Sequence, residues 1–172
     1  FIGLSIGGMV AQGLAVKRLD LVRAVALSNT AARIGNRQIW EDRISKVKSS
    51  GVKALTEETM KRWFSNKFLE GKELPIWKNM FERQPAKGYT GCSHAISGTD
   101  FYTSTSSLRL PTIAIAGSED GSTPPDLVRE TCNLIPGSKF NLIKGVGHIP
   151  CVEAPRKYAR ILSDFMKEIG HV

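Results

Sequence analysis

Three short apolar runs separated by helical patterns constrain the fold of this chain most strongly. They occupy residues 21–27, 111–117 and 139–145. The first is nearly continuous in apolar residues and bounded by polar ones, as expected for a strand buried on both faces. Helical patterns at 124–135 and 154–170 follow the other two runs. Alternating strands and helices predict an α/β fold, with a mostly parallel sheet flanked by helices and joined by right-handed crossovers.

The segment 36–107, between the first and second runs, has a different character. It is polar, rich in lysine and patterned as several short helices, the first of which ends at Gly51. We interpret it as a helical cap laid over one edge of the sheet, not as an independent domain. Residues 1–35 and 108–172 then form the core.

The first residues of the chain carry the motif G-x-S-x-G, in which Ser5 lies between Gly3 and Gly7. This motif forms a strained turn between a strand and a helix, and the turn points the serine hydroxyl off the sheet. A helical pattern follows over residues 8–18. We expect both glycines to be needed because the tight turn brings neighbouring backbones together. The alternative is a glycine-rich loop with an incidental serine, since such short motifs also occur by chance.

A serine needs a base to take its proton and an acid to orient that base, in the chain order Ser, Asp or Glu, His. "IAIAGSED" places Asp120, with Glu119 beside it, just after a predicted strand, and "IKGVGH" places His148 after the last one. Loops at strand C-termini carry function in open α/β sheets. The sequence therefore predicts a triad of Ser5, Asp120 and His148. A turn-forming aspartate and an ordinary loop histidine are the alternatives, and Glu119 stays open as the acid.

Charge and cysteine content narrow the function classes. The formal net charge of +8 comes from lysines and arginines spread along the chain, without the clustered basic and aromatic pattern of a nucleic-acid module, so no nucleic-acid partner is expected. No apolar stretch approaches the ~20 residues that span a bilayer, and no membrane partner is expected. Three widely spaced cysteines argue against a disulfide framework and a zinc site, and favour a cytoplasmic location. Cys151, near His148, is expected to be a small buried apolar residue.

The motifs together resemble a known family. "GLSIGG", "GSEDGSTPP" and "GVGHIPCVEAP" are in the style of the α/β-hydrolases, and "ALSNTAARIGNRQIWEDRISKVKSSG" resembles the 3-oxoadipate enol-lactonases. The resemblance runs along almost the whole chain and is weakest over 65–105. It implies a hydrolase that opens an anionic enol-lactone to 3-oxoadipate in aromatic-compound catabolism, without a metal or organic cofactor. By position it assigns Ser5 as nucleophile, Asp120 as acid and His148 as base.

The implied reaction needs further residues. The backbone N–H of Ile6, directly after the nucleophile, is expected to be one oxyanion donor, and the second donor belongs to a loop that this sequence does not contain. Because the substrate carries a carboxylate, Arg33 is predicted to bind it, arginine being suited to bidentate carboxylate recognition. Trp40 is predicted to form a pocket wall. A solvated or structurally paired arginine and a tryptophan that only packs the cap are the respective alternatives.

The motif at the start of the chain also predicts that the family's N-terminal strands are missing here, and that a segment carrying them completes the fold. A homo-oligomer that refills the sheet is another possibility. For function, the alternatives are another carboxylesterase, a haloperoxidase-like hydrolase, and a ligand-binding member or inactive fragment without catalysis.

Overall fold

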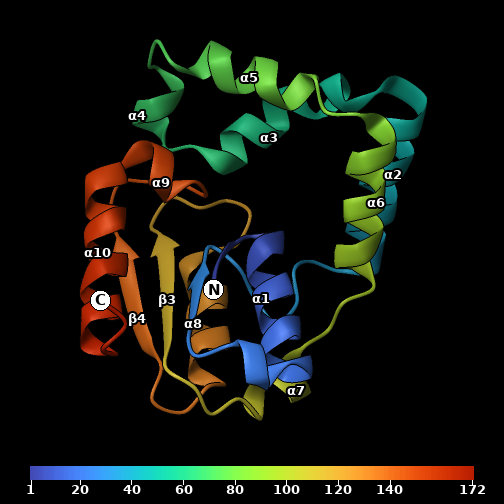
Figure 1. The fold of residues 1–172 in the computed structure, drawn as a ribbon. Coiled ribbons are helices and arrows are strands. Elements are labelled where there is room, and N and C mark those ends of the chain that lie inside the picture. Colours follow the sequence, from blue (N-terminus) through green and yellow to red (C-terminus); the bar gives the residue numbers. More distant parts are fainter.

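A computed structural model describes all residues, 1–172, and contains one four-stranded parallel sheet (Figure 1). The strands are β1 (Ile2–Leu4), β2 (Val25–Ser28), β3 (Thr112–Gly117) and β4 (Lys139–Ile143). They lie in the order β1-β2-β3-β4, and every neighbouring pair is parallel. The predicted α/β class and parallel sheet are confirmed.

Helices cover both faces of the sheet because its strands are apolar on both faces. Val25 and Leu27 of β2 pack in one cluster with α1 (Ile6–Lys17), and α8 (Pro125–Asn133) packs on the same side against Ala114 and Ala116 of β3. The intervening residues, among them Ile115, pack with α10 (Pro155–Glu168) on the opposite side. This period-2 division explains why the strands read as continuous apolar runs.

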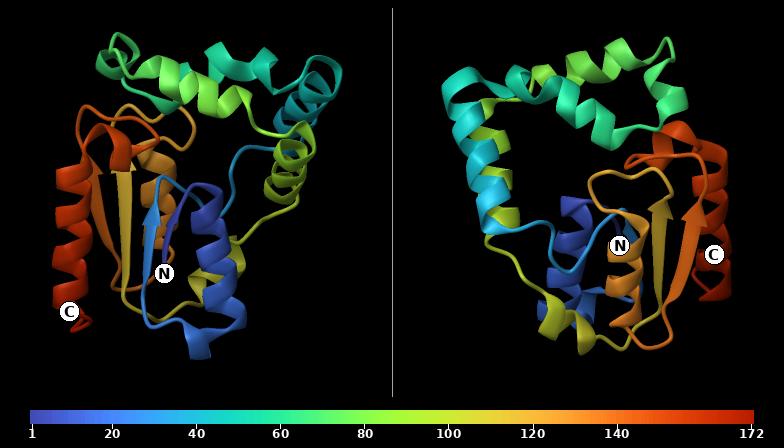
Figure 2. Two further views of the ribbon diagram at one scale, coloured as in Figure 1. Left: turned by 45° about the horizontal axis from the view of Figure 1, so that its top comes forward. Right: turned by 180° about the vertical axis from the view of Figure 1, so that it is seen from behind.

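A second layer of helices lies beyond the C-terminal ends of β3 and β4, as Figures 1 and 2 show. It consists of α2 (Arg37–Ser50), η2 (Val52–Leu55), α3 (Thr56–Trp63), α4 (Asn66–Leu69), α5 (Leu74–Glu82) and α6 (Ala86–Ser97). These helices share a small core of their own, which includes Val47, Leu55, Met60, Phe64 and Phe81. We call this layer the cap.

The cap ends earlier than residue 107, the boundary that the sequence predicted. Helix α7 (Tyr102–Ser106) lies beside α1, where the Thr105 hydroxyl donates a 2.8 Å hydrogen bond to Oε1 of Gln12. Phe101 packs against Gly13 so closely that a Cβ there would lie 3.1 Å from its ring. The polar serines and threonines after Phe101 therefore belong to the core, because their buried partners lie on α1.

The remaining short elements are η1 (Leu19–Leu21), which leads into β2, and α9 (Pro150–Glu153), which precedes α10. Strands β1 and β4 form the two edges of the sheet, and each has a neighbour on one side only. At the β1 edge, Phe1 and Ile2 are 59% and 56% exposed. Beside them a groove of about 390 Å³ is lined mainly by apolar side chains of β1, β2 and α10. We call this the β1-edge groove.

Candidate active site

Ser5 occupies a strained backbone position between β1 and α1. Its φ of 54° and ψ of −121° lie outside the regions that most L-residues adopt. The Ser5 N–H donates to the Ser28 carbonyl at 2.9 Å, and the Ser5 carbonyl accepts from the Thr30 hydroxyl at 2.7 Å. These bonds to the end of β2 hold the turn in place, as the strand-turn-helix motif requires.

The glycines around Ser5 differ in whether a side chain would fit at their positions. A Cβ at Gly3 would overlap the carbonyl of Gly7, and one at Gly8 would overlap the side chain of Thr30. A Cβ at Gly7 would meet nothing within 4 Å. The expectation that crowding requires Gly7 as well as Gly3 is therefore wrong, because Gly7 contributes its backbone to the close approach while its own Cβ position is open.

Asp120 and His148 form a buried hydrogen-bonded pair. Oδ2 of Asp120 lies 2.8 Å from Nδ1 of His148, and the two side chains are 0% and 4% exposed. Because an ionised carboxylate only accepts hydrogen bonds, Nδ1 carries the proton, and Nε2 is the ring nitrogen left for another partner. The structure thus brings together two of the three predicted triad residues in direct contact.

The Asp120 carboxylate is held by several further donors. Oδ1 accepts from the backbone N–H groups of Ser122 and Thr123 at 2.7 and 3.0 Å, and Oδ2 accepts from the Thr123 hydroxyl at 2.8 Å. Burial by itself raises the pKa of the Asp120 carboxyl. The hydrogen bond and charge of His148, followed by the hydrogen bonds from Asn29 and Thr123, outweigh that effect and lower the pKa below its ordinary value. Asp120 is therefore ionised at neutral pH.

Glu119 makes its hydrogen bond to the cap and not to His148. Its Oε2 accepts from the backbone N–H of Asn66 in the cap at 3.1 Å, and its side chain is exposed. Of the two carboxylates that the sequence left open, the structure places Asp120 in hydrogen-bond contact with His148.

Sequence reasoning missed Asn29, which is fully buried and has a left-handed φ of 46°. Its Nδ2 donates to Oδ2 of Asp120 at 2.9 Å and to the Gly147 carbonyl at 3.3 Å, and its Oδ1 accepts from the Ser28 hydroxyl at 3.0 Å. One side chain thus joins the loops that carry Asp120 and His148. Its position just after a buried parallel strand was a signal that could have identified it.

The cap contacts both loops through the end of α3. The Arg62 carbonyl accepts from the Gly121 N–H at 3.0 Å, and the Trp63 carbonyl accepts from the His148 N–H at 2.7 Å. The Trp63 ring also stacks on the imidazole at a centroid distance of 6.3 Å. A Cβ at Gly147 would overlap the Trp63 carbonyl, so this glycine permits the close contact.

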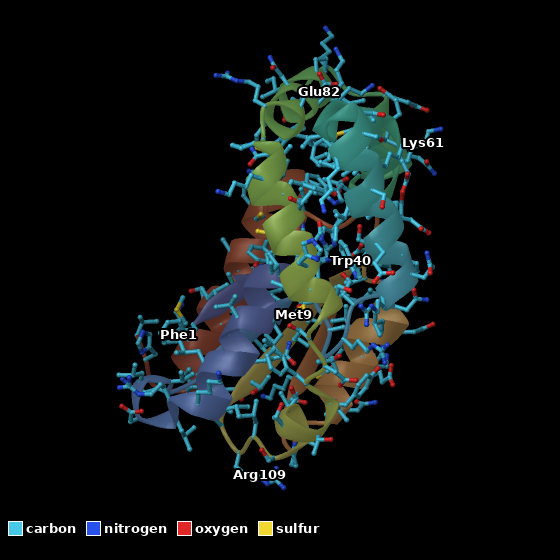
Figure 3. The ribbon with its side chains drawn as sticks, turned by 90° about the vertical axis from the view of Figure 1, so that its right-hand side faces the viewer. Phe1, Met9, Trp40, Lys61, Glu82 and Arg109 are labelled. Atoms are coloured by element: carbon cyan, nitrogen blue, oxygen red, sulfur yellow. The ribbon has the colours of Figure 1, made fainter.

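A cavity of about 370 Å³ between cap and core contains both Ser5 and His148 in its lining. No hydrogen bond joins the Ser5 hydroxyl to the imidazole in this structure, and such contacts often tighten only when substrate is bound. Trp40 also lines the cavity, and Figure 3 shows it where the cap meets the core, near Met9 of α1. Its indole N–H donates to the Ile34 carbonyl at 2.7 Å, so Trp40 both packs the junction and forms a cavity wall.

Comparison with known proteins identifies the fold. Comparison with protein-family models gives no match. An enol-lactonase from Burkholderia xenovorans has a TM-score of 0.92 and 30% identity, over 97% of this chain and 65% of that chain. The 3-oxoadipate enol-lactonase 1 of Acinetobacter baylyi is 30% identical over 171 residues. The chain has the α/β-hydrolase fold. A Mycobacterium tuberculosis protein named as a candidate non-heme bromoperoxidase, BpoC, is 26% identical over 180 residues.

This α/β-hydrolase chain spans 64% of the length of the Acinetobacter enol-lactonase. The matched part covers 98% of the chain, so both the core and the cap have counterparts in that relative. Ser5, Asp120 and His148 all lie within the matched range of an α/β-hydrolase, at the strand ends where this fold places its functional loops.

Of the two further residues that were predicted to meet the substrate, Ile6 lines the cavity and Arg33 does not. Ile6 is the first residue of α1 and lines the cavity, and an N–H in the first turn of a helix has no partner within the helix. Arg33 is absent from the cavity lining. Its guanidinium is half exposed and lies 3.7 Å from the Asp100 carboxylate at the surface.

Cys151 is exposed on α9, so the expectation of a buried apolar role is wrong, because the side chain points away from the core at the start of that helix. Partial burial nevertheless raises the pKa of its thiol, which does not favour a thiolate nucleophile. No group of three or more His, Cys, Asp or Glu side chains is placed to hold a metal ion, and none of the helices is long and apolar enough to cross a membrane.

Proposed function

We propose that the protein is a serine hydrolase of carboxylic esters, in which Ser5 is the nucleophile, His148 the base and Asp120 the orienting acid. The single observation that carries this proposal is that His148, hydrogen-bonded to the buried Asp120, lines the same cavity as the strained Ser5. His148 Nε2 takes the Ser5 proton as the hydroxyl attacks the ester carbonyl, and Asp120 stabilises the imidazolium that forms. The Ile6 N–H, at the N-terminus of α1, stabilises the oxyanion.

The acyl-enzyme is then hydrolysed by water, with His148 again acting as the base. The substrate that we propose is 3-oxoadipate enol-lactone. Opening this lactone leaves its alcohol part attached to the acyl group as an enol, which becomes the ketone of 3-oxoadipate. The names of the Acinetobacter and Burkholderia relatives support this choice, and the cavity supports an anionic substrate, since its lining holds two arginines and no carboxylate.

A haloperoxidase-like hydrolase is the second candidate, favoured by the similarity to BpoC. Reaction of the wild-type protein with a fluorophosphonate probe, followed by peptide mapping, tests the shared nucleophile. We expect the label on Ser5 alone. Enol-lactone hydrolysis measured beside that of neutral esters then separates the candidates, because a lactonase prefers the anionic lactone. Absence of a label on Ser5 would refute both.

We further propose that a segment beyond residues 1–172 pairs with β1. Phe1 and Ser5 make the hydrogen bonds to β2, so the N–H groups of Ile2 and Leu4 point toward the open edge. An open apolar edge is prone to pair with another strand, and the β1-edge groove offers an apolar surface beside it. The same segment would bring the second oxyanion donor.

Hydrogen exchange in the complete protein tests this pairing. We expect the amides of Ile2 and Leu4 to exchange at least about 100-fold more slowly than unstructured amides, because strand pairing protects them. The protection is expected to be independent of protein concentration. Protection that appears only at high concentration would instead indicate pairing between two copies, and unprotected amides would contradict the proposal.

A further inference from the structure

The cavity that contains Ser5 and His148 is positively charged. Two arginines, Arg43 and Arg62, belong to its lining, and no aspartate or glutamate does. The two cations differ in how far their hydrogen-bonding capacity is already used by the protein.

Almost all hydrogen-bond donors of the Arg43 guanidinium have partners within the protein. Its side chain is 8% exposed, and its guanidinium donates to the Tyr89 hydroxyl at 2.8 Å, the Thr59 hydroxyl at 3.1 Å and the Glu58 carboxylate at 3.1 Å. These contacts tie α2 to α3 and α6. Arg43 therefore acts as a structural residue of the cap.

Arg62 is not satisfied. Its Nε is buried and has no hydrogen-bond partner. Its nearest carboxylate is that of Glu58, 3.8 Å from Nη1, beyond hydrogen-bond range. Glu58 is also the acid for Arg43 and for Lys46, whose Nζ lies 4.0 Å away. One carboxylate thus faces three cations. Of the two arginines, Arg62 makes the longer contact with it.

Hydrogen bonds join the backbone at Arg62 and Trp63 to the loops that carry Asp120 and His148. The Arg62 carbonyl accepts from the N–H of Gly121, the residue after Asp120, and Gly121 leaves little room for a side chain, since a Cβ would lie 3.1 Å from Cα of Arg62. The next carbonyl, of Trp63, accepts from the His148 N–H. The guanidinium is therefore carried by a rigid point beside these two loops, and the side chain, which is 32% exposed, belongs to the cavity lining.

From these contacts we infer that Arg62 is the residue that binds the carboxylate of the substrate, an assignment that rests on the proposed ester hydrolase. A buried N–H without a partner costs free energy, and a charged acceptor recovers it. The edge of a guanidinium that carries Nε and one Nη matches the two oxygens of a carboxylate. Because protein atoms enclose Nε in this structure, the flexible Arg62 side chain turns when the carboxylate binds. A neutral ester lacks this acceptor, so Arg62 determines specificity for anionic substrates without taking part in bond cleavage.

Kinetics of Arg62→Gln in the complete protein test the assignment. We expect kcat/KM for the enol-lactone to fall about 30-fold, mainly through KM, because a charge-assisted hydrogen bond is lost. Hydrolysis of a neutral aryl acetate is expected to stay within about threefold of wild type. Arg62→Lys keeps the positive charge but lacks the two parallel N–H donors of a guanidinium, and is expected to recover only part of the loss. Arg83→Gln, at an exposed cap position, is the matched control.

Binding of adipate, a dicarboxylate, measured by calorimetry gives a readout that does not depend on turnover. We expect its dissociation constant to rise about tenfold or more in Arg62→Gln and to stay unchanged in Arg83→Gln. Equal adipate affinity in wild type and Arg62→Gln, or no adipate binding to wild type, overturns the assignment while leaving ester hydrolysis intact. A selective loss in Arg33→Gln instead would also overturn it. Failure of the hydrolase itself would appear as unlabelled Ser5 and no ester turnover.

Discussion

Ser5→Gly removes ester hydrolysis, with kcat/KM about 10⁶-fold below the wild-type value, and leaves the protein folded. The loss follows because the proposed nucleophile disappears, and removing the serine of a triad costs about this much. The fold is retained because Ser5 makes its contacts to Ser28 and Thr30 through its backbone. Steady-state kinetics and thermal unfolding of the same sample check both statements.

Ser5→Ala is the matched control for the backbone strain. It removes the same hydroxyl but keeps a Cβ at a φ of 54°. Both variants are expected to be inactive, with the glycine variant about 1 kcal/mol more stable than the alanine variant, because glycine accepts this conformation without strain. Residual activity of either variant within about tenfold of wild type would contradict the role of Ser5.

Gly3→Ala is expected to lower the free energy of unfolding by about 3 kcal/mol or more and to abolish activity. The added methyl group would overlap the Gly7 carbonyl, which is backbone and has no rotamer into which it can move. To make room, β1 and α1 must separate, and Ser5 lies between them. Denaturant unfolding and the rate of fluorophosphonate labelling measure the two effects.

Gly7→Ala provides the comparison within the same motif. Its Cβ position is open and lies within α1, where alanine is favoured over glycine by up to about 1 kcal/mol. We therefore expect unchanged or slightly raised stability. If both variants lose stability equally, the crowding at Gly3 is not what shapes the turn.

The core of the fold could be predicted because its signals are local. The apolar run of β2 and the amphipathic pattern of α10 each follow from their own residues, and parallel order follows from their alternation. Leu21 was predicted as the start of the first apolar run but is the last residue of η1, because only Val25–Ser28 pair with β1 and β3. Asp120 and His148 were found because strand ends carry functional loops.

The arginine that we propose to bind the substrate carboxylate could not be predicted in the same way. Arg62 lies in the polar pattern "TMKRWF", which indicates a helix but not what its residues face. Arg33 was chosen because it stands at the entry to the cap in sequence, yet the structure gives it Asp100 as neighbour. Which arginine lines the cavity depends on how α3 packs against the loops of Asp120 and His148. This is a tertiary contact between distant segments, and no local sequence pattern indicates it.

The two carbonyls at the end of α3 also limit how the cap can move. Lifting α3 away from the sheet breaks the bond to the His148 N–H and removes the ring of Trp63 from the imidazole. The base would then lose its support at the same moment as the cavity opens to solvent. Opening at this seam and loss of the proposed catalytic arrangement are thus one event. We therefore expect substrate and product to pass between α1 and the helices α2 and α6, while α3 keeps its contacts with the loops of Asp120 and His148.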